Sequence, residues 1–178
     1  MLKTRIAELN DLKVVLEIID RAVAFLAEQG SPQWQNGQNP SYEQLLADIQ
    51  AGYGYVLSFD DKVVGYASLI PGPDEVYTAI SEGTWLKLPA EVTQQNFLAI
   101  HRVAISNEVR GQGLAQNFMA DLLTEAKNLG YHDVRIDTYP RNLIMQKVIK
   151  RAGFTYQGMI HFNFADGERY AYQQLLAE

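Results

Sequence analysis

An almost unbroken apolar stretch at residues 97–106 (FLAIHRVAIS) limits what this chain can fold into. A strand that is apolar at nearly every position must be covered on both faces, as in the centre of a sheet flanked by helices. A glycine-bearing turn follows at once, and residues 113–129 then repeat apolar side chains at the spacing of an amphipathic helix. These three pieces predict a central strand, a tight turn and a helix, which belong to an α/β fold.

The rest of the chain alternates between helical and strand patterns. An amphipathic helix is predicted from Asn10 or Asp11 to Gly30, and a polar loop at 31–40 follows it. Residues 71–95 are expected to form a long loop with partial structure, because Gly and Pro recur there. Further helices are predicted over 42–49 and 142–152, and further strands over 53–59, 62–70, 133–139, 154–162 and 168–175. We expect one domain over 1–178, with a mixed sheet and helices on both faces.

Composition excludes several classes of function. The 178 residues carry a net charge of −6 and no cysteine, which excludes disulfides, zinc ribbons and a thiolate nucleophile. The three histidines are too far apart in sequence to form a metal-ligand motif, so no metal is expected. An acidic total argues against nucleic-acid binding, and no apolar run approaches the roughly 20 residues of a membrane span. We therefore expect a cytoplasmic protein with neither nucleic acid nor membrane as a partner.

The charge is unevenly distributed along the chain. Residues 1–100 hold six Lys or Arg against thirteen Asp or Glu, whereas residues 101–151 hold eight against five. The second segment is thus locally positive, by three charges, inside an acidic protein. Either this reflects solvated surfaces alone, or residues 101–151 bind an anionic ligand.

The turn after the apolar strand carries the strongest chemical signal. Two glycines let the backbone turn tightly and approach a ligand closely. The start of the following helix supplies unpaired N–H groups and the positive end of the helix dipole, which suit an anion such as a pyrophosphate. Alternatively, the glycines serve the geometry of the turn alone. The segment reads Arg110, Gly111, Gln112, Gly113, Leu114 and Ala115.

This segment resembles a signature of the GNAT superfamily of acyl-CoA-dependent N-acyltransferases. Within that superfamily, the chain is similar to the small bacterial N-acetyltransferases. The family pattern Arg/Gln-x-x-Gly-x-Gly/Ala is matched by Arg110, Gly113 and Ala115. A second family motif, an Asn followed after a helix by a Gly-Phe pair, is matched by Asn142 and Gly153-Phe154. The order of the predicted elements is similar over nearly the whole chain. The resemblance implies a mostly antiparallel central sheet in which one pair of strands splays apart.

The resemblance also implies a binding site for acetyl-CoA, without a metal. The pantetheine arm would pair with the backbone of Val103, Ala104 and Ile105 in the apolar strand. Asn142 would bond the pantetheine or orient the acyl end; alternatively it is a plain N-cap of its helix. The backbone amides that would hold the pyrophosphate of coenzyme A belong to Val109, Arg110, Gly111, Gln112, Gly113, Leu114 and Ala115.

Direct acetyl transfer to an amine needs a base and, in many family members, an acid for the departing thiolate. His101 is the candidate base, because a histidine titrates near neutral pH and lies on the apolar strand; alternatively it packs or bonds to backbone. The tyrosine that serves as the family's acid is replaced here by Ile149. Tyr139 and Tyr156 are candidate substitutes, unless both are packed aromatics or no acid is needed.

Other side chains are assigned to the acceptor or to structure. The candidates to line the acceptor site are Trp34, Tyr42, Glu82, Trp85 and Tyr172. Glu82 is also a second candidate base. Arg102, on the opposite face of the strand from His101, is expected to be a structural ion-pair partner.

The resemblance implies an N-acetyltransferase that acts on a primary amine of a small molecule by direct transfer in a ternary complex. The absence of cysteine is consistent with such transfer, because it excludes a cysteinyl acyl-enzyme. Two alternatives remain open at this point. The acceptor could be a protein N-terminus or a lysine, or the chain could be an acyl-CoA-binding module without catalysis. The chain would act as a monomer or a homodimer.

Overall fold

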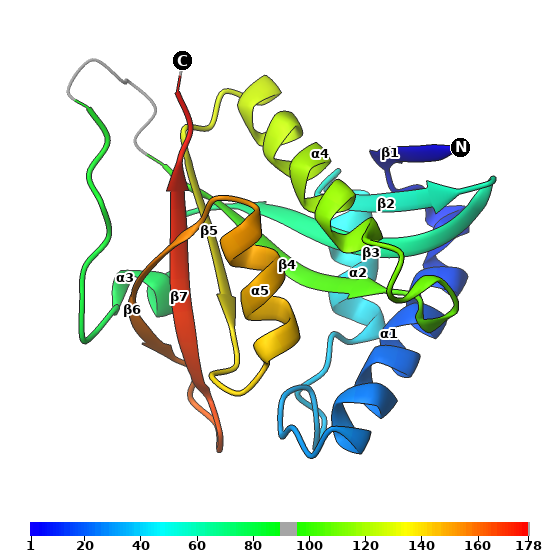
Figure 1. The fold of residues 1–178 in the computed structure, drawn as a ribbon, viewed down its shortest axis with the longest axis horizontal. Helices are drawn as coiled ribbons and strands as arrows, with labels where there is room; N and C mark the ends of the chain where they lie inside the picture. The colour runs from blue at the N-terminus through cyan, green and yellow to red at the C-terminus, as the bar shows by residue number, and fades with distance from the viewer. Residues whose placement is uncertain (90–95, 178) are drawn as a thin grey trace. The chain divides into compact units, whose positions relative to one another are not determined.

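The computed structural model describes residues 1–89 and 96–177 (Figure 1). The chain forms two compact units. The first unit comprises Met1–Ile70 and His101–Phe118, and the second comprises Pro71–Ile100 and Met119–Glu178. Strand β4 and helix α4 each contribute residues to both units. That the whole chain is one domain stays a prediction.

Two helices and a meander of strands form the first unit. Strands β1, β2, β3 and the carboxyl half of β4 follow one another in the sheet, and β1 and β3 both pair antiparallel with β2. A tight turn joins β2 to β3, in which Asp60 and Asp61 both adopt positive φ, as a two-residue hairpin turn of type I′ requires. The elements are β1 (Leu2–Ile6), η1 (Leu9–Asp11), α1 (Leu12–Glu28), α2 (Tyr42–Gln50), β2 (Gly54–Phe59), β3 (Lys62–Pro71), β4 (Leu98–Ile105), η2 (Asn107–Val109) and α4 (Leu114–Asn128).

The second unit surrounds the carboxyl-terminal strands. Strand β4 pairs in parallel with β5 through only three residues, Leu98–Ile100 against 134–136, whereas β7 pairs antiparallel with both β5 and β6. The short β4–β5 pairing is consistent with the splayed pair that was predicted. The remaining elements are α3 (Glu75–Thr78), β5 (Asp133–Thr138), α5 (Leu143–Arg151), β6 (Thr155–His161) and β7 (Glu168–Leu175).

The seven strands follow the order β1-β2-β3-β4-β5-β7-β6, which confirms the predicted mixed, mostly antiparallel sheet of an α/β fold. In the second unit, successive side chains of β7 point to opposite faces of the sheet, and a helix lies against each face. Ala171 packs in a cluster with Tyr77 of α3, while its neighbours Tyr170 and Tyr172 line a cavity with residues of α5. Among the described residues, none of the helices has the length and apolar character that a membrane span requires.

The apolar periodicity of the sequence explains the core of the first unit. Val15, Ile18 and Ile19 of α1 are buried against Leu45 of α2 and Val56 of β2, among others. Burying a side chain of this size stabilises the fold by about 1.5–3 kcal/mol.

The segment at 71–95, predicted to be a loop with partial structure, contains the four-residue helix α3 and an isolated bridge between Ser81 and Met159. Residues 90–95 of this segment lie outside the described part of the chain. Within the segment, Asp74 caps α3 by accepting hydrogen bonds from the N–H groups of Val76 and Tyr77. The Gly and Pro residues therefore predicted irregular backbone correctly but gave no sign of so short a helix.

Asp11 closes the turn between β1 and α1. Both terminal nitrogens of Arg5 donate to its carboxylate, at 2.7 and 2.9 Å, and the backbone N–H of Glu8 donates to it at 2.8 Å. The sequence predicted Asn10 or Asp11 as the N-cap of the helix; Asp11 occupies that position, but its side chain bonds backward, to Arg5 and Glu8. These hydrogen bonds from Arg5, more than any other interaction, lower the pKa of the Asp11 carboxyl below its ordinary value.

The Asp11→Asn variant should be less stable than the parent by about 2 kcal/mol at pH 7, because it removes a charge-assisted pair of hydrogen bonds. A lowered folded-state pKa stabilises the protein above the unfolded-state value of about 3.9, and this contribution is lost as the pH falls through the folded pKa. Urea unfolding between pH 3 and pH 7 would measure both effects. A variant whose loss of stability is the same at every pH would contradict the assignment.

Candidate functional site

The turn between β4 and α4 is held open by two left-handed glycines. Gly111 and Gly113 have φ values of 80° and 75°, which residues other than glycine adopt only with strain. A Cβ added at either position would meet no atom within 4 Å, so the space beside the turn is empty. The glycines therefore serve the backbone conformation and leave room for a ligand to approach the peptide groups.

The N–H groups of this turn lack backbone partners. In the described part of the chain, no backbone carbonyl accepts a hydrogen bond from the N–H groups of residues 111–115, whereas Gln116 and Asn117 both donate to Gly113. Buried side chains of Val109 and Leu114 anchor the turn at its two ends. Successive unpaired amides at a helix start form a cradle for an anion.

Arg110 is fixed beside this cradle. Its guanidinium lies 3.5 Å from the centroid of the Phe25 ring of α1, which is a cation–π contact. The neighbouring Glu108 accepts a hydrogen bond from Arg21 of the same helix, at 2.8 Å. Two contacts thus attach the turn to α1, and the cation of Arg110 stays next to the amide cradle.

Strand β4 contains a residue in an unusual conformation. Arg102 has a φ of 56°, in the left-handed region that is rare for residues other than glycine and costs of the order of 1–3 kcal/mol. This turn of the backbone interrupts the regular alternation of the strand, as a β-bulge does. The regular alternation of faces, on which the expected placement of Arg102 opposite His101 relied, therefore does not continue through Arg102.

A polar network holds Arg102 in place. Its guanidinium lies 3.2 Å from the carboxylate of Asp48 in α2, which confirms the predicted ion pair. Asp48 also accepts a hydrogen bond from the Ser68 hydroxyl at 2.6 Å, and Ser68 in turn bonds the Tyr66 hydroxyl at 3.0 Å. Burial, more than any other factor, raises the pKa of Tyr66 to about 12, so its hydroxyl stays protonated.

The predicted pantetheine residues adjoin Arg102 on the first unit. Ala104 is buried in the core of that unit, whereas His101, Val103 and Ile105 are half-buried. The strand stays attached to β3 beyond this point, because the N–H of Ser106 donates to the carbonyl of Val64.

The Asp48→Asn variant should lose about 2 kcal/mol of stability, since it leaves the partly buried Arg102 without its counter-charge while keeping an acceptor for Ser68. Chemical denaturation would measure the loss. Glu43→Gln, an exposed neutralisation on the same helix, is the matched control and should change stability by less than about 0.5 kcal/mol. Equal losses in the two variants would show that Asp48 acts through charge on α2 in general.

Asn142 caps helix α5 in the second unit. Its side-chain oxygen accepts a hydrogen bond from the N–H of Met145 at 3.1 Å, so the N-cap interpretation is confirmed. The cap uses the oxygen of the carboxamide, whereas a bond to the pantetheine arm would use its NH2 group. The pantetheine role of Asn142 therefore stays a prediction. Ile149, at the position of the family's tyrosine, is completely buried.

Tyr139 lies at the end of β5 and is buried. Its hydroxyl accepts a hydrogen bond from Arg141 at 3.1 Å, and the guanidinium of Arg169 lies 5.4 Å from the centroid of its ring. Because Arg141 donates to the oxygen of this hydroxyl, the O–H group of Tyr139 can itself donate a hydrogen bond to another acceptor.

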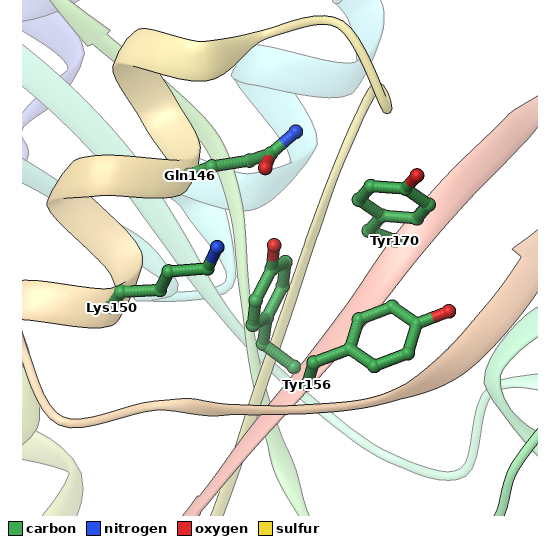
Figure 2. A pocket seen from close by; sticks show the side chains of 5 residues that line it. Gln146, Lys150, Tyr156 and Tyr170 are labelled. Atoms are coloured by element: carbon green, nitrogen blue, oxygen red, sulfur yellow. The ribbon is translucent and has the colours of Figure 1, made fainter.

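Tyr156 lines a cavity of about 370 Å³ (Figure 2). Gln146 and Lys150 of α5 and Tyr170 and Tyr172 of β7 form the rest of the lining. Tyr156 is about half exposed, and partial burial raises the pKa of its hydroxyl above the ordinary value. It is thus a neutral hydrogen-bond donor at neutral pH.

Trp85 is a packed aromatic of the second unit. Its indole N–H donates to the carbonyl of Tyr77 at 2.7 Å, and its ring centroid lies 5.6 Å from that of Tyr77. The guanidinium of Arg135 lies 4.2 Å from the Trp85 centroid and 4.1 Å from that of Phe97. These contacts give Trp85 a structural role in the second unit.

Two other candidates for the acceptor site lie on loops with unusual backbone. Trp34 belongs to the first unit, where its half-buried ring packs against the core; Glu82 belongs to the second unit and is exposed. Both have positive φ, of 61° and 54°. Among residues 1–89 and 96–177, no cluster of three or more His, Asp or Glu side chains could hold a metal ion.

Sequence reasoning found the turn at 110–115 but missed two features. The left-handed Arg102 has no sequence signal, because nothing but its backbone distinguishes it from an ordinary strand residue. The cavity beside Tyr156 combines residues from three elements, α5, β6 and β7. Tyr170 and Tyr172 alternate along β7, and this pattern by itself indicates only one face of a strand.

Comparison with known proteins places this chain among acetyltransferases. The sequence model of the acetyltransferase (GNAT) family matches residues 22–154. A GNAT-family acetyltransferase from Streptococcus agalactiae is 35% identical, with a TM-score of 0.88 over 99% of this chain and 96% of that chain. None of the curated proteins matches.

Two solved structures share the fold at lower identity. The protein yncA from Salmonella typhimurium, solved with its cofactor acetyl-CoA, is 20% identical, with a TM-score of 0.68 over 99% of this chain and 95% of that chain. The ribosomal-protein-S18-alanine N-acetyltransferase from Escherichia coli is 12% identical, with a TM-score of 0.67 over 100% and 96% of the two chains.

Proposed function

This chain belongs to the acetyltransferase (GNAT) family, and from that premise we propose that it transfers the acetyl group of acetyl-CoA directly to a primary amine of a small molecule. The observation that carries the proposal is the open amide cradle at residues 111–115, at the start of α4. It fits a pyrophosphate because it offers several N–H donors, the positive end of a helix dipole and open space beside its two glycines.

The cofactor would be bound chiefly by backbone. The pyrophosphate oxygens would accept hydrogen bonds from the cradle, with Arg110 as a neighbouring cation. The amide groups of the pantetheine arm would pair with the backbone of Val103, Ala104 and Ile105, as an added strand does. In the second unit, Asn142 would supply a side-chain amide donor to the same arm.

Transfer would proceed with the amine and acetyl-CoA bound together. The amine nitrogen forms a bond to the acetyl carbon, the carbon–sulfur bond breaks, and the sulfur leaves as a thiolate. His101 would take the proton that the ammonium group must lose, and Tyr139 or Tyr156 would give a proton to the thiolate. Tyr156 is a candidate for the second task because its hydroxyl carries a proton at neutral pH and the side chain is about half exposed, so a substrate could reach it.

The acceptor would be a cationic amine. Trp34, Glu82 and Trp85 would contact it, and the excess of carboxylates over residues 1–100 favours a cationic amine. Ile149 at the usual position of the acid favours one competing function, an acyl-CoA-binding module without catalysis. A protein N-terminus as acceptor is the other alternative, because the similar Escherichia coli enzyme acetylates an alanine of a ribosomal protein.

The test is the release of coenzyme A thiol from acetyl-CoA in the presence of a panel of small primary amines and of peptides with free N-termini. The proposal predicts amine-dependent release with at least one small amine. Tight binding of coenzyme A without release from any member would support the binding module, and release with peptides alone would move the acceptor to the protein class.

The Gly113→Asp variant should lose acetyl-CoA binding by about a hundredfold or more, because a carboxylate would stand in the anion cradle. Gly130→Asp is the matched control. Gly130 also has a left-handed φ, of 85°, and open space around it, but it ends α4 instead of starting it. Calorimetric titration with acetyl-CoA would compare them, and equal losses in both variants would remove the cradle from the cofactor site.

The His101→Ala variant should reduce kcat/KM by about a hundredfold, the usual contribution of a general base. A histidine base works in its neutral form, so activity falls as the pH drops through its pKa, and the variant should lack this acidic limb. Steady-state kinetics from pH 5 to pH 9 would measure it, with the exposed His161→Ala as the control. An unaltered profile in His101→Ala would exclude His101 as the base.

A further inference from the structure

The cavity beside Tyr156 has the size and lining of a ligand site. Its volume of about 370 Å³ lies in the range of small-molecule sites, roughly 300–1,000 Å³. All five lining residues belong to the second unit: Gln146 and Lys150 project from α5, and three tyrosines project from β6 and β7 (Figure 2). None of the lining residues belongs to the amide cradle or to strand β4.

The polar groups that line this cavity favour an anion. Lys150 contributes the single formal charge, and no carboxylate belongs to the lining. Tyr172 is only 1% exposed, and its ring packs edge-on against that of Tyr156 in the wall of the cavity. The hydroxyls of the lining tyrosines can donate hydrogen bonds to an acceptor that binds in the cavity. Burial raises the pKa values of Tyr156 and Tyr172, which keeps both protonated.

The walls of the cavity are aromatic and held in position. The ring of Tyr156 lies edge-on to those of Tyr170 and Tyr172, with centroids 5.3 and 5.9 Å apart. The carboxamide of Gln146 donates to the carbonyl of Pro140 at 2.6 Å, which fixes that side chain as part of the wall. A flat apolar group could pack against both the faces and the edges of these rings.

We propose that this cavity binds a small organic carboxylate with a flat apolar body, its carboxylate at the Lys150 ammonium and the tyrosine hydroxyls and its body against the rings. One cation matches the single negative charge of a carboxylate, whereas phosphate recognition commonly uses several cations or an arginine fork. The proposal goes beyond acetyl transfer and does not rest on it, because its readout is binding alone.

Benzoate is the probe, and benzamide, which has the same ring without the charge, is its control. Titration of the full-length protein followed by amide NMR should shift the signals around residues 146–150, 156 and 170–172 saturably with benzoate. Benzamide should bind about tenfold more weakly, since a charge-assisted hydrogen bond is worth roughly twice a neutral one.

Variants assign the contacts. Lys150→Met should weaken benzoate binding by about tenfold, while Lys147→Met, at an exposed position of the same helix but outside the lining, should not. Tyr172→Phe removes only the hydroxyl and should weaken binding by about fivefold.

Three results would overturn the proposal. These are the absence of saturable shifts around the cavity, equal affinity for benzoate and benzamide, and unchanged binding in Lys150→Met. A fourth is displacement of benzoate from these signals by coenzyme A, because the cavity would then belong to the cofactor and Tyr156 to the reaction. Retained benzoate binding in the presence of saturating coenzyme A supports a separate site.

Discussion

Unpaired backbone N–H groups at the start of α4 are the constraint on which the proposed function of this chain depends. Gly111 and Gly113 hold the turn in a left-handed conformation, and the space beside both glycines is open. Among the described residues, no backbone carbonyl accepts a hydrogen bond from the N–H groups of residues 111–115. Such groups cost free energy unless water or a ligand accepts their hydrogen bonds. An anion that binds several of them at once replaces water with little reorganisation, which explains how a protein of net charge −6 can bind a polyanionic cofactor.

Strand β4, which leads into this turn, is shaped by a second constraint. The left-handed conformation of Arg102 is unfavourable by itself, and its pairing with Asp48 of α2 offsets that cost through a network that continues to Ser68 and Tyr66. The geometry of the strand next to His101 thus depends on a helix far away in the sequence. Helix α2 therefore contributes to the shape of the proposed site although none of its residues is proposed to contact a substrate.

Sequence patterns predicted the α/β sheet and the turn at 110–115 because both depend on local physics: apolar periodicity, and glycines before a helix. Boundaries differed by a few residues, as for α5, predicted over 142–152 and observed over Leu143–Arg151. The sequence predicted that Arg102 forms an ion pair, but neither its partner Asp48 nor its left-handed φ follows from the local sequence. The cavity at Tyr172 and the packing of Trp85 arise from tertiary contacts between distant segments, which periodicity does not encode.

A crystal structure of this chain with coenzyme A would test the central claim most directly. The pyrophosphate oxygens should lie about 3 Å from the backbone nitrogens of residues 111–115, and the pantetheine amides should pair with the backbone of residues 103–105. A coenzyme A molecule whose pyrophosphate is held elsewhere, with these N–H groups still facing water, would contradict the claim that this turn binds the cofactor.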